Sequence, residues 1–364
     1  MAGYWSTAID VLAVRLDTIG DVLMTGPALR ALRDSAARPR VTLLTSSPGA
    51  EAGELMPEVD ELIVYEAPWM KRDSGEPGAA ADRAMVDELR RRRFDAAVIF
   101  TVYSQSPLPA ALMCHLAEVP LRLAHCRENP YRLLTDHVPE SEPHDRVRHE
   151  VRRQLDLVAT VGATTADERM SVELPEAKHA RARALLAELG IDEARPWLVV
   201  HPGASAPSRR YPVEGWAEAC RRLADDHGMQ IVMTGDAHEA QLTDSIQRAA
   251  GLPDRSLAGR LDLATLGALL DAAPVLVAGN TGPVHLAAAV GTPVVDLYAL
   301  TNPQHTPWGV PSRVLSHDVP CRWCQKSVCP ERHHLCLRGV TPDEVVRAAL
   351  ALGGARKSAA VSDS

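Results

Sequence analysis

The sequence lacks a long apolar run, an excess of positive charge and an abundance of aromatic residues. Its 364 residues carry a formal net charge of −8, which argues against a dedicated nucleic-acid-binding protein, because such proteins usually present a basic face. No run of about 18 apolar residues is present, and a predicted strand begins at Ile9 in place of a charged and apolar leader. We therefore expect a cytoplasmic protein that contacts a membrane, if at all, only peripherally at its inner face.

The cysteines do not resemble the disulfide framework of a small secreted protein. Of the 7 cysteines, three are scattered through predicted core or helix segments. The other four follow the spacing Cys-x2-Cys-x4-Cys-x6-Cys and are Cys321, Cys324, Cys329 and Cys336. Four clustered thiols in a cytosolic protein favour a tetrahedral zinc site, although the later spacings are not those of a standard zinc ribbon. A structural zinc ion at this cluster is therefore a hypothesis.

What is present indicates an α/β protein with two domains. Hydrophobic residues make up 46% of the chain but aromatic residues only 4%, so the helices should pack through small and aliphatic side chains. A chain of this length exceeds what one hydrophobic core usually supports. Strand and helix patterns alternate from Ile9 and restart at Trp197. We expect an N-terminal domain at 1–175, a C-terminal domain at 176–340, and a final helix with a disordered tail at 341–364.

One turn near the C-terminus has the features of an anion-binding site. An apolar run from Val275 stops at Gly279-Asn280-Thr281-Gly282, and a short helix begins at Pro283. Glycines permit close approach of a ligand, and the free N–H groups at the start of a helix favour an anion. His285 lies in the first turn of that helix, where a neutral imidazole could donate a hydrogen bond to a ligand oxygen. Alternatively, the glycines only close a turn and His285 satisfies a backbone carbonyl.

Asp21 is the candidate catalytic residue of the N-terminal half. It follows Gly20 at the end of the strand predicted at Ile9–Arg15, where open α/β sheets place their ligands. A carboxylate there is held ionised by the positive end of the next helix, but the residue could equally be a simple helix N-cap. The turn lacks the G-x-G-x-x-G pattern of a dinucleotide-binding unit, which counts against a dehydrogenase.

Two further positions in the C-terminal half could bind a nucleotide. Arg209 and Arg210 lie in a turn rich in glycine and proline after the strand ending at His201, and a guanidinium matches the geometry of phosphate oxygens. Glu239, in the first turn of a later helix, could complement the helix dipole or accept hydrogen bonds from a ribose diol. An exposed arginine pair is common, so these residues remain candidates.

Three segments together resemble the heptosyltransferases of glycosyltransferase family 9. They are the opening Arg15-Leu-Asp-Thr-Ile-Gly-Asp21-Val with Pro27-Ala-Leu, the segment from His201-Pro-Gly-Ala-Ser205 to Arg209-Arg-Tyr-Pro212, and Asn280-Thr-Gly-Pro-Val-His285-Leu-Ala-Ala-Ala. The cysteine cluster followed by Leu337-Arg-Gly-Val-Thr-Pro-Asp-Glu344 also looks like the end of many members. The resemblance covers nearly the whole chain in the same order.

This resemblance implies a GT-B fold, with two Rossmann-like doubly wound domains facing across a cleft, and a last helix that often packs back on the first domain. It also implies inverting transfer of a heptose from ADP-heptose to a lipopolysaccharide core sugar, with no metal in catalysis. The N-terminal domain would bind the acceptor, and Asp21 would be the general base. Arg209 would stand where a phosphate-binding lysine is common, with Arg210 as competing candidate. The donor-binding set implied by the resemblance is Gly20, Ser205, Arg209, Arg210, Glu239, Asn280, Thr281, Gly282 and His285.

Two alternatives stay open from the sequence. The chain could use another nucleotide sugar and transfer it to a natural product or another cell-surface acceptor. Its Ala- and Arg-rich composition is typical of a GC-rich genome, and some organisms with such genomes lack lipopolysaccharide. It could also be a nucleotide-sugar-binding subunit without turnover, although Asp21 beside a complete set of donor motifs argues against this. An epimerase of the same fold is less consistent with the sequence, because a second acid–base carboxylate is not evident.

Overall fold

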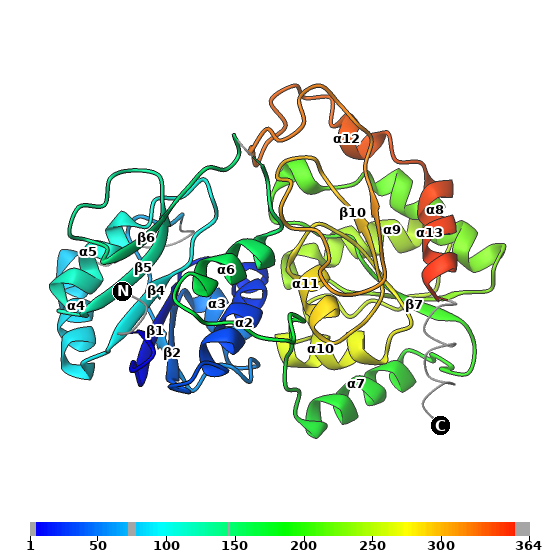
Figure 1. Cartoon of the computed structure of the whole chain (residues 1–364). Helices are drawn as coiled ribbons and strands as arrows, with labels where there is room; N and C mark the ends of the chain where they lie inside the picture. The colour runs from blue at the N-terminus through cyan, green and yellow to red at the C-terminus, as the bar shows by residue number, and fades with distance from the viewer. Residues whose placement is uncertain (1–4, 72–77, 145, 354–364) are drawn as a thin grey trace. The chain divides into compact units, whose positions relative to one another are not determined.

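The computed structural model describes residues 5–71, 78–144 and 146–353 (Figure 1). The chain divides into two compact units, one ending at Glu173 and the other beginning at Leu174. Each unit has its own parallel sheet covered by helices on both faces. The disordered tail expected at 355–364 lies outside the described residues. Within the described part, no helix is both long enough and apolar enough to cross a membrane.

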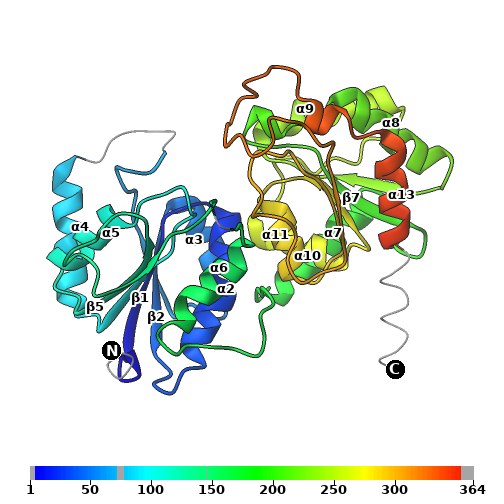
Figure 2. The same cartoon turned by 45° about the horizontal axis from the view of Figure 1, so that its top comes forward.

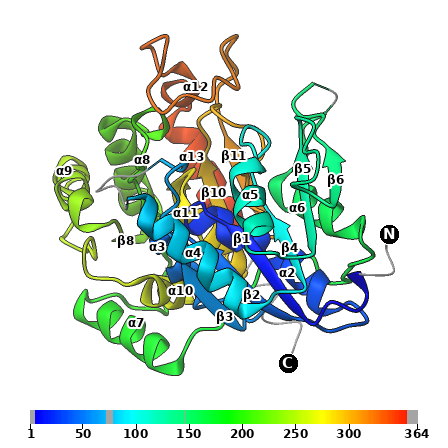
Figure 3. The same cartoon turned by 90° about the vertical axis from the view of Figure 1, so that its left-hand side faces the viewer.

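The first unit contains a six-stranded sheet in the order β3-β2-β1-β4-β5-β6, with all strands parallel. Its strands are β1 (Asp10–Arg15), β2 (Arg40–Thr45), β3 (Glu61–Val64), β4 (Ala96–Ile99), β5 (Leu121–Cys126) and β6 (Asp136–Pro139). Its helices are α2 (Ile19–Arg33), α3 (Ser47–Gly53), α4 (Ala79–Arg92), α5 (Leu108–Leu116) and α6 (Glu150–Ala159). Helices α4 and α5 cover one face of the sheet (Figure 3), and α2, α3 and α6 cover the other (Figure 2).

The second unit contains a five-stranded parallel sheet in the order β11-β10-β9-β7-β8. Its strands are β7 (Trp197–His201), β8 (Gln230–Met233), β9 (Leu276–Gly279), β10 (Val294–Leu297) and β11 (Ser312–Leu315). Its helices are α7 (Glu176–Glu188), η1 (Pro207–Arg209), α8 (Val213–Asp225), η2 (Ala237–Glu239), α9 (Ala240–Ala250), α10 (Leu263–Ala272), α11 (Gly282–Ala289), α12 (Leu335–Arg338) and α13 (Pro342–Gly353). Helices α8, α9 and α13 share one face of the sheet, and α7, α10 and α11 lie on the other (Figure 2).

The strands read as continuous apolar runs because both faces of each sheet are covered by helices. Every residue of β4, β7, β9 and β10 is buried, and this burial of aliphatic side chains is the main stabilising term of the fold. The exceptions matter for function, since Arg15 ends β1 and Asp296 lies within β10, both fully buried.

The final helix packs in the core of the second unit. Helix α13 buries Val345, Ala349 and Leu352 in the same core as α8 and the second sheet. Its apolar face is therefore used within the second unit. Its first turn is capped as the sequence indicates, because Thr341 N donates to Glu344 Oε2 over 2.7 Å.

Candidate active site

The start of α2 presents Asp21 at the carboxyl end of β1. The helix begins at Ile19, and Thr18, with an extended backbone, occupies the N-cap position. Asp21 is therefore the third helical residue and not the N-cap, so the simpler structural alternative is wrong. Its carboxylate still lies in the first turn, where the helix dipole stabilises negative charge. Gly20, which precedes it, is buried in the same turn.

Asp21 is held by an arginine that the sequence analysis did not single out. The guanidinium of Arg15 is buried and contacts three carboxylates, with Nε 2.9 Å from Asp17 Oδ2, Nη2 3.0 Å from Asp21 Oδ1 and Nη1 2.9 Å from Glu150 Oε1. Burial lowers the pKa of Arg15, but the three carboxylates together raise it above its usual value. Arg15 thus stays charged and fixes the position of Asp21.

The three carboxylates around Arg15 differ in their access to solvent. The side chain of Glu150 is 1% exposed, that of Asp17 is 11% exposed and that of Asp21 is 19% exposed. Burial raises the pKa of Asp17 to about 6, although Arg15 opposes this shift. Asp21 is therefore the carboxylate of this group that an incoming molecule reaches most easily.

In the second unit, the glycine-bearing turn between β9 and α11 has the predicted form. Gly282 is the first residue of α11, and Thr281 is its N-cap with an extended backbone. The Thr281 hydroxyl donates to Gly279 O over 3.2 Å instead of accepting from the helix N–H groups. The start of α11 thus has no side-chain cap, which is compatible with the way that helix N-termini bind phosphates.

Polar residues from neighbouring strands and loops surround this turn. Asn280 Nδ2 donates to His305 O over 3.0 Å, and the ring of His285, which is buried, lies edge to face with His305 at a centroid separation of 6.4 Å. Asp296 on β10 lies beside Asn280. Burial raises the pKa of Asp296 well above its usual value, while Asn280 and the charge of Arg209 lower it. Asp296 and His305 were not singled out in the sequence; a carboxylate within the apolar strand Val294–Leu297 was the available signal for Asp296.

The structure separates the two candidate arginines. If Gly279 carried a Cβ atom, that atom would lie 3.3 Å from the carbonyl oxygen of Arg209. The turn at η1 therefore packs closely on the end of β9. The charge of Arg209 also acts on Asp296 and Tyr298. Arg210 instead donates from Nε to Ala204 O over 2.8 Å. Arg209 therefore belongs to the turn at Asn280, and Arg210 belongs to a neighbouring pocket.

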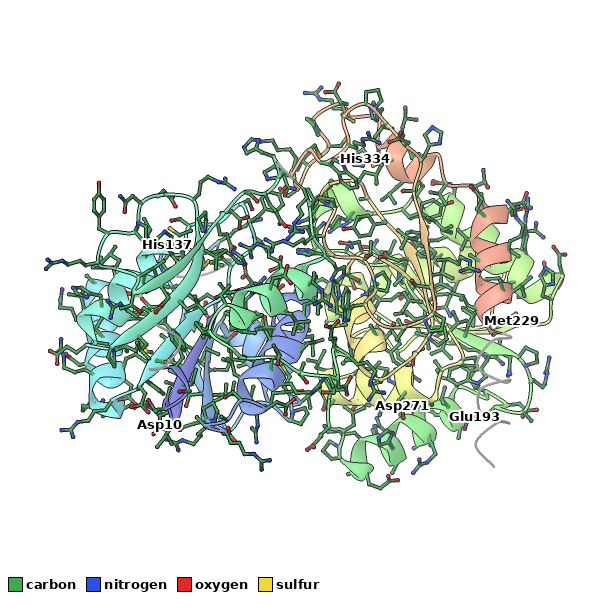
Figure 4. All side chains as sticks on the ribbon, viewed as in Figure 1. Asp10, His137, Glu193, Met229, Asp271 and His334 are labelled. Carbon is green, nitrogen blue, oxygen red and sulfur yellow. The ribbon has the colours of Figure 1, made fainter. Side chains whose placement is uncertain are left out.

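That neighbouring pocket has a volume of about 470 Å³ and contains the remaining candidates. Ser205, Arg210 and Glu239 line it together with His334, which precedes α12 (Figure 4). The carboxylate of Glu239 lies against Gly203, where any Cβ would come within 1.9 Å of Oε1. Its Oε2 accepts from Asp236 N over 3.0 Å in a capping box, which supports the helix-dipole interpretation of this residue.

His201 lies beside Glu239 but does not form an ion pair with it. The two side chains are 3.7 Å apart, from His201 Nε2 to Glu239 Oε2. Burial lowers the pKa of His201 to about 4, so the imidazole is neutral at pH 7 and its Nδ1 is 3.1 Å from the Thr234 hydroxyl. Burial also raises the pKa of Glu239, and the hydrogen bond from Asp236 opposes that shift.

The cysteine cluster does not form the predicted zinc site. Among the residues that the structure describes, no three or more His, Cys, Asp or Glu side chains are grouped so as to hold a metal ion. Backbone hydrogen bonds anchor the loop elsewhere, from Trp323 N to Leu300 O over 2.7 Å and from Ser208 N to Ser327 O over 3.0 Å. Cys321 and Cys336 pack on a small apolar cluster around Tyr298. The cysteine-rich loop therefore supports η1, and the zinc hypothesis for Cys321, Cys324, Cys329 and Cys336 is withdrawn.

Comparison with known proteins agrees with this architecture. The model of glycosyltransferase family 9 (heptosyltransferase) matches residues 83–335. Lipopolysaccharide heptosyltransferase 2 of Escherichia coli (strain K12) is 25% identical over 347 residues, covering 92% of this chain and 96% of that protein. The crystal structure of a family 9 glycosyl transferase from Veillonella parvula superimposes with a TM-score of 0.78 at 18% identity, covering 95% of this chain and 97% of that one. The structure of E. coli ADP-heptose LPS heptosyltransferase II superimposes with a TM-score of 0.74 at 23% identity, covering 96% of this chain and 100% of that one. The expected GT-B fold is confirmed.

Proposed function

The chain belongs to glycosyltransferase family 9, the heptosyltransferase family, and from that premise we propose that it transfers a heptose-type sugar from ADP-heptose to a saccharide hydroxyl, such as one of the lipopolysaccharide core. The enzyme class follows from family membership. The donor is proposed because a structurally similar protein is described as an ADP-heptose LPS heptosyltransferase. The acceptor is proposed because several relatives are lipopolysaccharide heptosyltransferases.

The observation that supports turnover most strongly is the placement of Asp21. It is a partly exposed carboxylate in the first turn of α2. Its position is fixed by the buried Arg15, which also contacts the carboxylates of Asp17 and Glu150. A protein that only bound a nucleotide sugar would not need an oriented carboxylate at this position. We therefore assign Asp21 as the general base.

The proposed reaction is a single displacement at the anomeric carbon. The acceptor hydroxyl attacks this carbon from the side opposite the leaving group, and Asp21 takes the hydroxyl proton as the new glycosidic bond forms. The bond to the diphosphate breaks in the same step, so the configuration inverts and ADP leaves with the bonding electrons. Such general-base assistance typically contributes about 10²–10⁴-fold to the rate.

The negative charge that develops on the leaving diphosphate needs stabilisation as the bond breaks. We assign this role to the start of α11 at Gly282, to the His285 side chain, to the Thr281 hydroxyl and to Arg209. Asp296 and Asn280 would orient Arg209 and the turn. Ser205, Arg210 and Glu239 line the neighbouring pocket, and we propose that this pocket holds the nucleoside, with Glu239 accepting from the ribose.

Release of ADP tests the proposed function directly. Purified protein incubated with ADP-heptose and a heptose-free lipopolysaccharide core should release ADP and increase the acceptor mass by one heptose. Release without a mass increase would indicate hydrolysis only, whereas binding of the donor without ADP release would support a non-catalytic subunit. If the protein neither binds ADP-heptose nor releases ADP, ADP-heptose is excluded as the donor.

Substitutions in the turn before α11 should act mainly on donor binding. We expect Thr281→Val and His285→Ala each to weaken ADP affinity by about tenfold or more, because each removes a polar partner near the diphosphate in a largely buried site. Isothermal titration calorimetry with ADP measures this change. Thr292→Val is a matched control, since its buried hydroxyl donates to Leu270 O over 2.6 Å at the other end of α11. An unchanged affinity in both turn variants would contradict the assignment.

A further inference from the structure

The cysteine-rich loop, residues 316–334 between β11 and α12, projects from the body of the second unit. It is drawn in orange at the top of Figure 1, and it projects in the same way in the turned view of Figure 3. The loop is closed at its base, because His317 N donates to Cys336 O over 2.8 Å. Further along, Cys321 Sγ lies 3.8 Å from His333 Nε2. Its two ends are thus adjacent, as in the compact surface loops that often carry function.

Backbone hydrogen bonds fix this loop to the core of the second unit. Trp323 N donates to Leu300 O over 2.7 Å. Gln325 N donates to Thr301 O over 2.9 Å. Trp323 has a φ of 64°, in the left-handed region that residues with a Cβ rarely adopt. The fold thus holds a tryptophan at this position against its backbone preference, which points to a role for the side chain.

Large apolar side chains are exposed on this segment more densely than elsewhere in the described chain. Of the 11 such side chains that are exposed among the described residues, four lie between positions 314 and 335. They are Val314 at 41%, Trp323 at 41%, Val328 at 63% and Leu335 at 46% exposure. Single exposed apolar residues are ordinary, but a group of them on one projecting segment marks an interaction surface.

The same segment has the opposite charge to the chain as a whole. Between positions 313 and 338 there are five basic and two acidic residues, whereas the whole chain has a formal net charge of −8. All five cations are exposed, and they are Arg313, Arg322, Lys326, Arg332 and Arg338. The ion pair between Arg322 Nη1 and Asp318 Oδ1, at 3.1 Å, joins two exposed side chains and is screened by water. The segment is therefore complementary to a negatively charged surface.

Apolar residues and cations alternate along this segment. Each apolar residue from position 323 on follows a cation by at most three positions: Arg322 precedes Trp323, Lys326 precedes Val328, and Arg332 precedes Leu335. A lipid headgroup layer accommodates this pattern, because indoles and aliphatic side chains insert at the acyl boundary while Arg and Lys reach the phosphates. A protein partner would instead favour a continuous apolar centre with charged residues at its rim. The pattern therefore favours a lipid surface.

We propose that the cysteine-rich loop docks this protein on an anionic lipid bilayer, with Trp323 and Val328 at the headgroup boundary and with Lys326 and Arg332 on lipid phosphates. The proposal does not rest on the proposed transferase function. A glycolipid acceptor, which that function includes, would be presented at such a surface. Lipid binding and turnover can therefore be measured separately.

Vesicle sedimentation with the full chain tests the proposal. The probes are vesicles of pure phosphatidylcholine and vesicles that also contain about 30% phosphatidylglycerol, which gives a negative surface potential. We expect binding to the anionic vesicles to be at least about tenfold stronger, and to fall at least about tenfold between about 0.1 M and about 0.5 M salt. Equal binding to both kinds of vesicle, or binding to neither, would overturn the proposal.

A charge-reversal pair locates the contact on the loop. Lys326→Glu combined with Arg332→Glu should weaken binding to the anionic vesicles by about tenfold or more. Arg195→Glu combined with Arg248→Glu is the matched control, because it changes the net charge equally at exposed positions of the second unit outside the segment. Both double variants should unfold at the wild-type temperature, since the replaced side chains are exposed. An equal loss of binding in the two double variants, or no loss in the loop pair, would overturn the proposal.

The apolar part of the contact has its own test. Trp323→Ala should weaken binding to the anionic vesicles about fivefold, because the indole contributes most of the apolar area at the boundary. Tyr131→Ala, at 83% exposure in the first unit, should leave binding within about twofold of wild type. A larger loss in Tyr131→Ala than in Trp323→Ala would place the membrane contact on the first unit and overturn the proposal.

Sedimentation velocity without vesicles distinguishes a lipid surface from a second copy of this chain. We expect the wild type and Trp323→Ala to have the same mass in solution. A wild-type oligomer that this substitution dissociates would mean that the segment covers another copy, and it would overturn the proposal. ADP release with a water-soluble core saccharide should be equal in the wild type and the loop variants. Release of ADP by a wild type that binds no vesicles would overturn the docking proposal and leave the transferase proposal standing.

Discussion

Replacing Asp21 with alanine should reduce glycosyl transfer by about 10²–10⁴-fold while the affinity for ADP stays within about twofold of wild type. The reason is that Asp21 is proposed to act on the acceptor hydroxyl, whereas the residues proposed for the nucleotide all lie in the second unit except Gly20. The fold should survive the change, because Arg15 keeps its contacts with Asp17 and Glu150. Initial rates of ADP release at saturating donor measure the loss, and calorimetry measures the affinity.

Two further variants distinguish the loss of a proton acceptor from the loss of one negative charge beside Arg15. Asp21→Asn retains the shape of the side chain but cannot take a proton, so its activity should fall as far as that of the alanine variant. Asp17→Asn also removes one carboxylate from Arg15, but it should retain more activity than either Asp21 variant, because Asp17 is already bound to Gln105 and is less exposed. Full activity in Asp21→Asn would remove this residue from the mechanism.

Replacing Arg15 with methionine should destabilise the first unit by about 3–5 kcal/mol, the typical cost of removing one partner from a buried ion pair. Methionine fills most of the arginine volume, so the loss of stability arises more from the missing charge than from poorer packing. Glu150, with a side chain 1% exposed, would lose its 2.9 Å contact with Arg15 and keep the more distant Arg153 at 3.9 Å, while Asp17 would lose Arg15. Hydrogen exchange of the amides in β1 and β4 should accelerate by about a hundredfold or more. Amides in β7 and β9 provide an internal reference from the second unit.

The destabilisation should depend on pH in a defined direction. Burial already raises the pKa of Asp17 to about 6 in the wild type, above the unfolded value of about 3.9. Between these values the native state holds a proton that the unfolded state releases, so this group's contribution to stability falls as pH rises. Loss of Arg15 removes the charge that opposes the shift, so the pKa should rise further. The deficit of Arg15→Met should therefore be larger at pH 8 than at pH 5.

Arg33→Met is the matched control for this prediction. Arg33 and Asp60 form an ion pair in the same unit at 2.9 Å, but their side chains are 37% and 30% exposed. Such pairs usually contribute about 0–1 kcal/mol, because water and salt screen them. A loss of similar size in both variants, or a deficit in Arg15→Met that does not change with pH, would contradict a dominant role for the buried charge.

The local features of the fold and site could be predicted from the sequence because they depend on neighbouring residues. The apolar run ending at Gly279, the glycines around Asn280 and the proline at the second helical position together specify the turn before α11. The capping box at Thr341–Glu344 is local in the same sense. Asp21 could be recognised as a candidate, although its position three residues beyond the N-cap could not, since helix starts are uncertain from sequence alone.

Only the tertiary structure brought distant residues together. Arg15 and Glu150 are 135 positions apart, and no local pattern links them. Arg209 and Arg210 are adjacent in sequence, yet packing of η1 on Gly279 directs them to different surroundings. The zinc hypothesis depended on spacing alone, whereas metal binding depends on how side chains are grouped in space, and among the described residues no three or more His, Cys, Asp or Glu side chains are grouped so as to hold a metal ion. The sequence by itself determined the strands, helices and turns, whose hydrogen bonds and side-chain periodicity are local, whereas burial and charge pairing depend on which elements pack together, and the folded chain alone decided these.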